Sequence, residues 1–317
     1  MRKVGVATIS YSNNAEIKAG LEAVLKAWER LLECAAYDRP DIVLLPEHFA
    51  LTGIPLPYNL EEVAEAVDDV PAGPVTQFLA TQARRHKYYI YASYPRRAAV
   101  PGHYHNSAVL FDRQGRIACV YDKTFPAVEE IERGILPGRG AVTFDTDFGR
   151  VGAGICFDFN FRDRELFPEY RRQKTELFCF LSAFPGGFQL PIVAYENQMF
   201  IATAICGEPN KGRIVNPLGR IVKDGRAEGT AIFAEINLDY RMLHMGLNQH
   251  KIPALKAKYK KLVQVDAARE EGVYLLTSLH PEVSVDQMIQ EYELETLDDY
   301  FQRSLRKRAR ALARQRR

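Results

Sequence analysis

The amino-acid sequence predicts a layered α/β fold whose sheets hold both parallel and antiparallel strands. Short runs rich in Val, Ile, Phe and Tyr recur along the first 240 or so residues, as buried strands do. Stretches with helical periodicity separate some of these runs, and tight turns such as residues 112–116 separate others. Helical connections favour parallel neighbours and tight turns join antiparallel ones, so mixed sheets are expected.

The apolar runs also give the order of the elements. Strands are expected at residues 3–9, 41–46, 88–94, 106–112, 117–122, 151–155, 176–183, 199–206 and 230–236. Between the first two strands, apolar side chains keep the three-and-four spacing of one face of a long helix, at Ile17, Leu21, Val24, Leu25, Trp28, Leu31 and Leu32. Further helices are expected at about residues 74–86 and 162–173.

The chain changes character near residue 250. Residues 1–250 carry the strand-rich pattern and are expected to form one main domain, followed by a mainly helical C-terminal extension at residues 251–317. The end of this extension, residues 303–317, holds eight Arg or Lys and no acidic residue. The net charge of the whole chain is only +2, so no broad field would attract nucleic acid or an anionic membrane. Neither is expected as a partner.

The first residues and the cysteines bear on location. The apolar stretch after Arg2 and Lys3 is too short for a signal peptide, and no run approaches the ~18 apolar residues that span a bilayer. A soluble, cytoplasmic protein is therefore expected. The cysteines are odd in number and show no C-x-x-C spacing, which argues against a disulfide framework or a zinc site: Cys34, Cys119, Cys156, Cys179 and Cys206.

Three reactive residues stand where predicted strands end. Glu47 follows a buried run stopped by Pro46, and Lys123 follows the run at 117–121. Cys156 ends the glycine-rich run 151–155, where small residues allow a tight bend that lifts the thiol into a cleft. Each residue alone has a structural alternative: a solvated glutamate, a solvated lysine or a buried cysteine.

Together the three residues indicate one site, because the ends of three strands of one sheet can meet in a single cleft. Glu47 would take the thiol proton and pass it to a leaving amine. Lys123 and the backbone amide of Phe157 would stabilise the tetrahedral oxyanion. The scheme needs no histidine, metal or organic cofactor, and it predicts a cysteine-dependent hydrolase with catalytic residues Glu47, Lys123 and Cys156.

The segments around these residues resemble the nitrilase superfamily of carbon–nitrogen hydrolases, with its Glu-Lys-Cys triad. The similarity covers roughly residues 3–240 and is carried by residues 44–49, 121–123, 137–138 and 154–158. Further blocks agree at residues 106–108, 182–184, 195–198 and 216–220. The resemblance implies an α-β-β-α sandwich. It also implies a homodimer or larger homo-oligomer, in which helices flanking the nucleophile pack across subunits.

The resemblance further implies a second glutamate after the lysine that orients the site. Counting back from Pro137 and Gly138 favours Glu132 and then Glu130 for this role. The chain also departs from the family pattern at Phe125, where a histidine is often found. A second departure is Val193, where an arginine is common.

Amide or carbamoyl substrates are expected rather than nitriles. Nitrilases proper usually carry Trp-Glu-Asn after the cysteine, whereas residues 157–160 here are Phe-Asp-Phe-Asn. Phe159 and Asn160 cannot grip a substrate carboxylate as the arginines of the carbamoyl branch do; Arg162 is a candidate substitute. The expected pocket residues are Phe184, Asn160 and His48, although strand alternation would point His48 away from the Glu47 carboxylate.

Three alternatives stay open. The same triad could hydrolyse nitriles. The chain could be an inactive scaffold that binds a partner through its basic tail, at residues such as Arg306 and Arg310. A metal hydrolase using His103 and His105 is the third, although no further ligand lies near them in the sequence.

Overall fold

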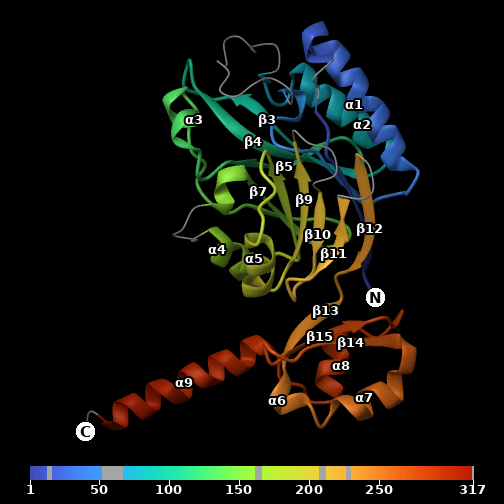
Figure 1. Cartoon of the computed structure of the whole chain (residues 1–317), viewed down its shortest axis with the longest axis vertical. Helices are drawn as coiled ribbons and strands as arrows, with labels where there is room; N and C mark the ends of the chain where they lie inside the picture. The colour runs from blue at the N-terminus through green and yellow to red at the C-terminus, as the bar shows by residue number, and fades with distance from the viewer. Residues whose placement is uncertain (13–15, 52–66, 161–165, 207–211, 226–229, 316–317) are drawn as a thin grey trace. The chain divides into compact units, whose positions relative to one another are not determined.

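The computed structural model describes residues 1–12, 16–51, 67–160, 166–206, 212–225 and 230–315 (Figure 1). The chain forms two compact units. One is Val4–Ile236, and the other joins Met1–Lys3 to Asn237–Arg317. The division at residue 250 expected from composition stays a prediction.

Within the described residues of the larger unit, one six-stranded sheet has the order β12-β1-β2-β3-β4-β5. Strands β1, β2 and β3 pair in parallel, whereas β3, β4 and β5 pair antiparallel. The strands are β1 (Lys3–Ile9), β2 (Ile42–Leu44), β3 (Tyr89–Arg97), β4 (Tyr104–Phe111), β5 (Ile117–Asp122) and β12 (Ala231–Asn237). The predicted mixed sheet is confirmed.

A second six-stranded sheet of the same unit has the order β11-β10-β9-β8-β7-β6 among the described strands. Its centre, β7 to β9, is parallel, and its outer pairs are antiparallel. The strands are β6 (Thr143–Asp145), β7 (Arg150–Ile155), β8 (Leu177–Ser182), β9 (Phe200–Ile205), β10 (Arg213–Val215) and β11 (Ile221–Asp224). Sequence reasoning missed β6, β10 and β11, because each holds at most two consecutive apolar residues, whereas the equally short β2 lies in the apolar run 42–45.

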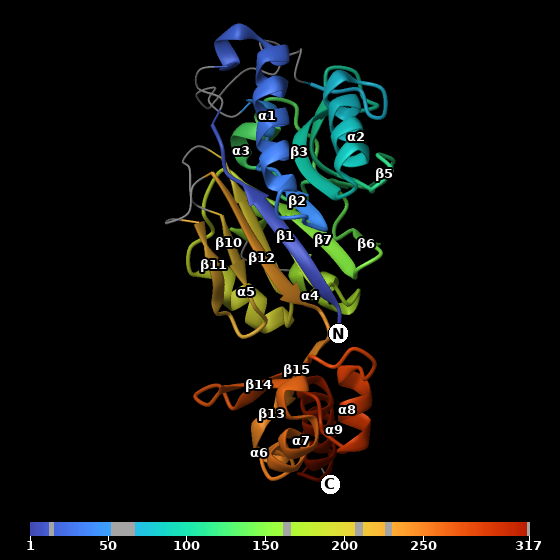
Figure 2. The ribbon, with the colours of Figure 1, turned by 90° about the vertical axis from the view of Figure 1, so that its right-hand side faces the viewer.

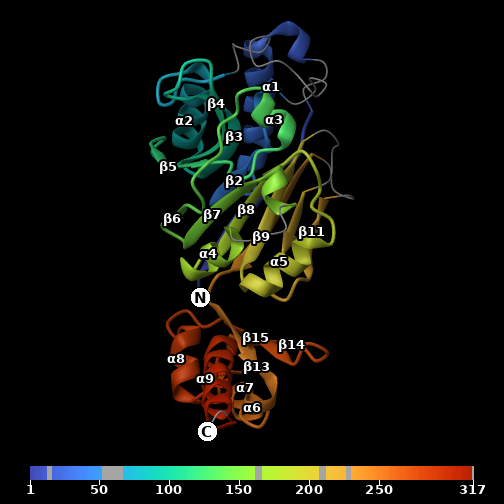
Figure 3. The ribbon, with the colours of Figure 1, turned by 90° about the vertical axis from the view of Figure 1, so that its left-hand side faces the viewer.

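Helices cover the outer face of each sheet, and the inner faces pack together. On the first sheet, α1 (Leu21–Ala36) and α2 (Pro74–His86) bury Trp28 and Leu79 in one core (Figure 2). On the second sheet, α4 (Leu166–Arg172) and α5 (Gln189–Asn197) bury Tyr170 and Leu190 in another (Figure 3). Strands β2, β3 and β4 contact β9, β8 and β7. The α-β-β-α layering expected from the resemblance is confirmed.

One of the three predicted helices agrees with the structure at both ends, and the other two differ from it. The helix expected at 74–86 is α2, Pro74–His86, which begins at a proline with no backbone donor to lose. The long helix expected after the first strand is interrupted: a short 3₁₀ helix, Glu16–Ala19, precedes α1, and Gly20 between them has φ 91°. The third helix is α4, which begins at Leu166; the expected start at residue 162 lies outside the described residues.

The smaller unit holds a three-stranded antiparallel sheet, β13-β15-β14, in its described part. Its strands are β13 (Tyr240–His244), β14 (Val263–Ala268) and β15 (Val273–Ser278). Its helices are α6 (Met245–Asn248), α7 (Ile252–Tyr259), α8 (Val285–Glu291) and α9 (Leu297–Gln315). The expectation of a mainly helical extension overlooked β14 and β15, which stabilise the unit by packing Leu276 against Leu255 and Met288. No helix in the described ranges is long and apolar enough to cross a membrane.

Candidate active site

Glu47 lies just after β2 and is almost fully buried, at 5% exposure. One carboxylate oxygen, Oε1, accepts hydrogen bonds from Asn106 Nδ2 at 2.8 Å and Lys123 Nζ at 3.0 Å. The other, Oε2, accepts from the backbone N–H of Ala183 at 3.0 Å. Burial raises the pKa of this carboxyl, but the Lys123 ammonium, His48 and the hydrogen bonds to the carboxylate together outweigh burial, and the net shift is downward. Glu47 is therefore a buried carboxylate that stays ionised.

Lys123 follows β5 directly and is 1% exposed. Its ammonium lies 3.0 Å from Glu47 Oε1 and 2.6 Å from Glu130 Oε2. Burial disfavours the charged amine, but the two carboxylates reverse that effect and raise the pKa of Lys123. A permanently charged, buried ammonium is thus fixed between two acids.

Glu130 is the second acid that contacts Lys123. It belongs to α3 (Val128–Glu132), and its carboxylate also accepts from Asn106 Nδ2 at 3.0 Å and from the Ala127 N–H at 2.7 Å. Glu132, which was favoured by counting back from Pro137 and Gly138 in the sequence, is exposed on the same helix. The preference for Glu132 is not supported by the geometry, because residues two apart on a helix point to different sides and only Glu130 faces inward.

Cys156 directly follows β7 and begins a 3₁₀ helix, Cys156–Phe159. Its φ of 44° lies in the left-handed region, which is costly for a residue with a side chain and often marks a functional turn. The thiol lies beside the Glu47 carboxylate and the backbone amide of Ala183, and both affect its pKa. Burial and the negative Glu47 raise the pKa of the thiol, although Lys123 opposes them. Cys156 therefore holds its proton next to a base able to remove it.

Asp158 fixes the turn that carries the cysteine. It is 1% exposed, and its carboxylate accepts from the Ile155 N–H at 2.8 Å, the Tyr121 hydroxyl at 2.7 Å and the Phe125 N–H at 2.9 Å. Burial raises the pKa of Asp158 to about 6, with the hydrogen bonds opposing the rise. Because Tyr121 and Phe125 flank Lys123, this one side chain ties the lysine segment to the cysteine turn.

The three predicted residues converge, but not on one sheet as expected. Glu47 and Lys123 follow β2 and β5 of the first sheet, whereas Cys156 follows β7 of the second. The Ala183 amide that contacts Glu47 follows β8, also in the second sheet. The expectation of a single sheet was wrong, because strand pairing between distant segments decides which sheet a strand joins. The site instead lies where the two facing sheets meet.

His48 lies closer to the acidic groups than strand alternation suggested. A ring nitrogen of His48 and carboxylate oxygens of Glu47 and Glu130 all lie within 4.8 Å of one another. The alternation rule fails here because His48 has φ 48° and the chain has already left the extended conformation. Burial lowers the pKa of the imidazole, which the two carboxylates oppose.

This trio, Glu47, His48 and Glu130, is also the set of potential metal ligands found among the described residues. The Lys123 ammonium already sits between its two carboxylates, where an added cation would be repelled. The alternative pair, His103 and His105, belongs to no such group in the described part of the chain.

The other predicted pocket residues stand at the edges of the site. Asn160 is exposed and ends the 3₁₀ helix of the cysteine turn, with Gln189 Nε2 3.5 Å from its Oδ1. Phe184 is half-buried and packs edge-on against Phe180, with ring centroids 5.6 Å apart. Phe157, whose amide was expected to bind an oxyanion, is the second residue of the 3₁₀ helix. Arg162 lies outside the described residues.

Sequence reasoning assigned no role to two groups that organise the site. Asn106 is 0% exposed on β4 and donates to both Glu47 and Glu130, and the Ala183 amide donates to Glu47. The available signal for Asn106 was a polar residue beginning a predicted buried strand, since a buried amide must be hydrogen-bonded. A backbone donor such as that of Ala183 leaves no trace in the sequence.

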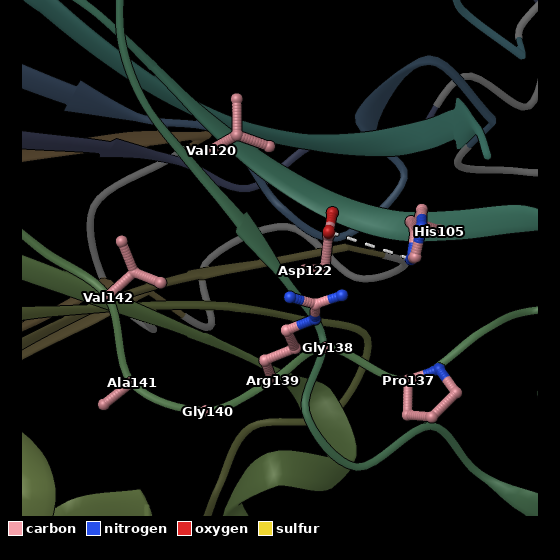
Figure 4. A pocket seen from close by; sticks show the side chains of 9 residues that line it. All are labelled: His105, Val120, Asp122, Pro137, Gly138, Arg139, Gly140, Ala141 and Val142. Carbon is pink, nitrogen blue, oxygen red and sulfur yellow. Dashed lines mark ion pairs between the residues drawn. The ribbon is translucent and has the colours of Figure 1, made fainter. Parts of the chain in front are cut away.

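A pocket of about 410 Å³ lies against β4, β5 and the segment 137–142 (Figure 4). It is lined by His105, Val120, Asp122 and residues 137–142, and by none of the three predicted catalytic residues. Arg96 donates twice to the Asp122 carboxylate, at 2.9 Å each, and His105 Nδ1 lies 3.8 Å from it. Because its acid is already paired, this pocket offers a ligand no free negative charge.

Known sequences of carbon-nitrogen hydrolases match most of this chain. The profile of the family described as carbon-nitrogen hydrolase matches residues 3–242. The omega-amidase NIT2 of Bos taurus is 27% identical over 271 residues, covering 75% of this chain and 90% of the relative. The omega-amidase NIT2 of Homo sapiens is 26% identical over 260 residues, covering 73% of this chain and 88% of the relative.

Solved structures share the fold. An amidase from Nesterenkonia sp. superposes with a TM-score of 0.61 at 18% identity, covering 74% of this chain and 90% of that chain. Nit3 of Saccharomyces cerevisiae, a member of branch 10 of the nitrilase superfamily, gives a TM-score of 0.61 at 23% identity, with the same coverage of 74% and 90%. A mutant of the Nesterenkonia sp. AN1 amidase carries the acetamide moiety of fluoroacetamide covalently on its active site cysteine.

Proposed function

The chain belongs to the carbon-nitrogen hydrolase family, and on that premise we propose that it hydrolyses small amides or carbamoyl compounds through a thioester on Cys156. The observation that carries the proposal is the Glu47 carboxylate, which lies beside the Cys156 thiol and is held by the Lys123 ammonium. This arrangement supplies a nucleophile, a base and a fixed positive charge in one buried cluster.

In the first half-reaction, Glu47 removes the Cys156 proton as the sulfur attacks the substrate carbon. The C=O electron pair moves to oxygen, where the Lys123 ammonium and the Phe157 amide stabilise the oxyanion. When the carbonyl re-forms, the C–N bond breaks and Glu47 gives its proton to the departing nitrogen. Ammonia or an amine leaves, and the acyl group stays on sulfur as a thioester.

In the second half-reaction, Glu47 removes a proton from water, which attacks the thioester. The C–S bond breaks, the acid is released, and the proton returns to Cys156. Glu47 can serve in both halves because its pKa is lowered and that of the thiol is raised, so that between these two pKa values Glu47 is ionised while the thiol keeps its proton. Glu130 and Asn106 keep Lys123 and Glu47 in position through their hydrogen bonds.

An amide is favoured as substrate by the relatives as well as by the residues after the cysteine. The matching mammalian proteins are omega-amidases. Hydrolysis of a nitrile by the same triad remains the alternative, and the assembled site supports an active enzyme over an inactive scaffold. Ammonia release from a panel of primary amides, carbamoyl amines and nitriles tests the choice: the highest kcat/KM should be found among the amides or carbamoyl amines.

The decisive control compares two cysteines. Cys156→Ala should abolish ammonia release, whereas Cys34→Ala, which changes an exposed thiol on α1, should leave it unchanged. Both variants should keep the circular dichroism spectrum of the unmodified protein. Retained turnover by Cys156→Ala would refute the proposal.

We also propose that the enzyme works in the cytoplasm as a homodimer or larger homo-oligomer. All five cysteines are described as free thiols, which suits a reducing compartment. Phe188, just before α5, is 78% exposed, as an apolar residue awaiting a partner subunit would be. Light scattering on the purified protein should give at least twice the mass of one chain, 36.0 kDa.

A further inference from the structure

Helix α9 is anchored to its unit only by its first turns. Leu297 is buried, and the Tyr300 ring stacks on His244 with centroids 3.7 Å apart. Arg303 pairs with Glu295 at 2.6 Å. Every described residue from 304 to 315 is exposed, and Figure 1 shows these turns extending away from the sheet of their own unit.

The exposed turns present an apolar stripe. Phe301, Leu305 and Leu312 are 51%, 64% and 40% exposed. Their spacing of four and then seven residues places them along one side of the helix, with Ala309 at the margin and the long side chain of Arg308 between Leu305 and Leu312. Three large apolar side chains in one line on an otherwise polar helix are more than chance exposure, because such a stripe usually has something to bury it.

The opposite side is cationic. Arg306, Arg310 and Arg314 follow one another at intervals of four residues, so they share a face roughly opposite the stripe. Arg303 and Lys307 widen this face, which carries no acid from residue 303 onward. The two acids of the helix, Asp298 and Asp299, lie in its first turn, where they stabilise the helix N-terminus.

We propose that α9 is an interfacial helix that binds the surface of anionic lipid bilayers. A helix lying in such a surface buries an apolar face among the acyl chains and is attracted by negative headgroups through its Lys and Arg, so this partner uses both faces of α9 at once. Nucleic acid would use only the cations. A second copy of the helix would bring two basic segments together, which like-charge repulsion opposes.

This association differs from spanning a membrane, for which α9 is too polar. It also departs from the sequence-based expectation of no membrane partner, which rested on the net charge of +2 for the whole chain. Attraction to a charged surface decays within about one Debye length, roughly 8–10 Å, so the charge of this local segment matters more than the total.

Co-sedimentation of the full-length protein with vesicles tests the proposal. Vesicles of phosphatidylcholine alone are compared with vesicles that also contain phosphatidylglycerol. The unmodified protein should bind the anionic vesicles at least roughly tenfold more tightly, and added salt should weaken this binding. Equal binding to both vesicles, or none to either, would overturn the proposal.

Two sets of substitutions separate the faces. Leu305→Gln with Leu312→Gln removes two of the three large side chains of the stripe, and Arg306→Gln with Arg310→Gln and Arg314→Gln removes three cations; glutamine favours helix in both. Each set should weaken binding to anionic vesicles at least roughly tenfold. Gln302→Ala is the matched control and should bind as the unmodified protein does. Helix content and ammonia release should stay unchanged throughout.

Other outcomes assign a different occupant. If the stripe variant binds vesicles as well as the unmodified protein does, the helix does not insert and the proposal is wrong. Tight, salt-sensitive binding to a DNA or RNA duplex without vesicle binding would make nucleic acid the partner. A loss of mass in light scattering caused by the stripe variant, again without vesicle binding, would show that α9 packs against a second copy of the chain.

Discussion

The thiol of Cys156 and the carboxylate of Glu47 lie beside each other, although they follow strands of two different sheets. The pair holds one proton, and that proton rests on sulfur because the pKa of the thiol is raised and that of the carboxyl is lowered. The nucleophile Cys156 thus begins the reaction uncharged, and the base Glu47 begins it negatively charged. The predictions below follow from this distribution and from the groups that maintain it.

Replacing Glu47 by glutamine should let the cysteine ionise more easily. Burial and the negative Glu47 raise the pKa of Cys156, while Lys123 lowers it, so removing the negative charge shifts that pKa downward. In a pH titration, thiolate absorbance assigned by difference from Cys156→Ser should appear at lower pH in Glu47→Gln than in the unmodified enzyme. An unchanged or higher titration midpoint would contradict the electrostatic coupling.

The same Glu47→Gln variant should be nearly inactive even though it forms thiolate more readily. Glutamine cannot shuttle protons to the leaving nitrogen or from water, and such general acid–base transfer typically contributes about 10² to 10⁴ in rate. The kcat for ammonia release should therefore fall at least roughly a hundredfold, with the protein still folded by circular dichroism. Substantial remaining turnover would mean that another group moves the proton.

Lys123→Met should harm stability as well as activity. The variant leaves two carboxylates, Glu47 and Glu130, facing each other without the buried ammonium that separates them. Removing one partner from a buried ion pair typically costs about 3–5 kcal/mol. Urea unfolding should show a loss of that order, and ammonia release should vanish.

Lys123→Arg separates charge from shape. The larger planar guanidinium keeps the positive charge but does not fit the position of a compact ammonium, so activity should stay low. Part of the stability lost in Lys123→Met should return. Recovery of near-normal kcat in Lys123→Arg would show that charge alone is sufficient.

Glu130 and Glu132 form a matched pair of tests on one helix. Glu130→Gln weakens contacts to Lys123 and to the Ala127 amide, so kcat should fall roughly tenfold or more, as losses in supporting shells often do. Glu132→Gln changes an exposed side chain and should have little effect. Steady-state kinetics on both variants decides which acid supports the site. A larger loss of kcat in Glu132→Gln than in Glu130→Gln would favour Glu132, as counting back from Pro137 and Gly138 did.

Asp158 should give the protein a stability that depends on pH. Its pKa is raised from 3.8 to about 6, so the stabilisation it provides is complete below the unfolded value and is lost as pH rises through about 6. The stability of Asp158→Asn relative to the unmodified protein should therefore rise between about pH 4 and pH 7, by roughly 1–3 kcal/mol at 1.36 kcal/mol per pKa unit. Urea unfolding at several pH values measures it, and a constant difference would contradict the shift.

The activity of Asp158→Asn should depend on the hydrogen bonds that this side chain accepts rather than on its charge. An amide has one acceptor oxygen, so it cannot receive the Ile155 and Phe125 amides and the Tyr121 hydroxyl together. The cysteine turn should loosen, and kcat should fall more than KM rises. Full activity would show that the turn keeps its shape without this carboxylate.

Much of the fold could be predicted because its signals are local. The alternating or continuous apolar runs gave nine of the described strands of the two large sheets, and the three-and-four spacing gave α1 and α2. The same reasoning failed for β6 and β10, which hold at most two consecutive apolar residues and so show no run or period. It also failed at Gly20, where a single residue with φ 91° divides the expected long helix.

For the candidate site, the sequence by itself determined which residues carry reactive groups. Strand ends and glycine spacing identified Glu47, Lys123 and Cys156 as candidate reactive side chains. This was possible because the end of a strand depends mainly on neighbouring residues along the chain. Only the tertiary structure decided that they come from two facing sheets, that Glu130 rather than Glu132 contacts the lysine, and that Asn106 and the Ala183 amide hold Glu47. These contacts join segments up to 136 residues apart, and pairing over such distances is chosen by the packing of the whole core, which no local pattern records.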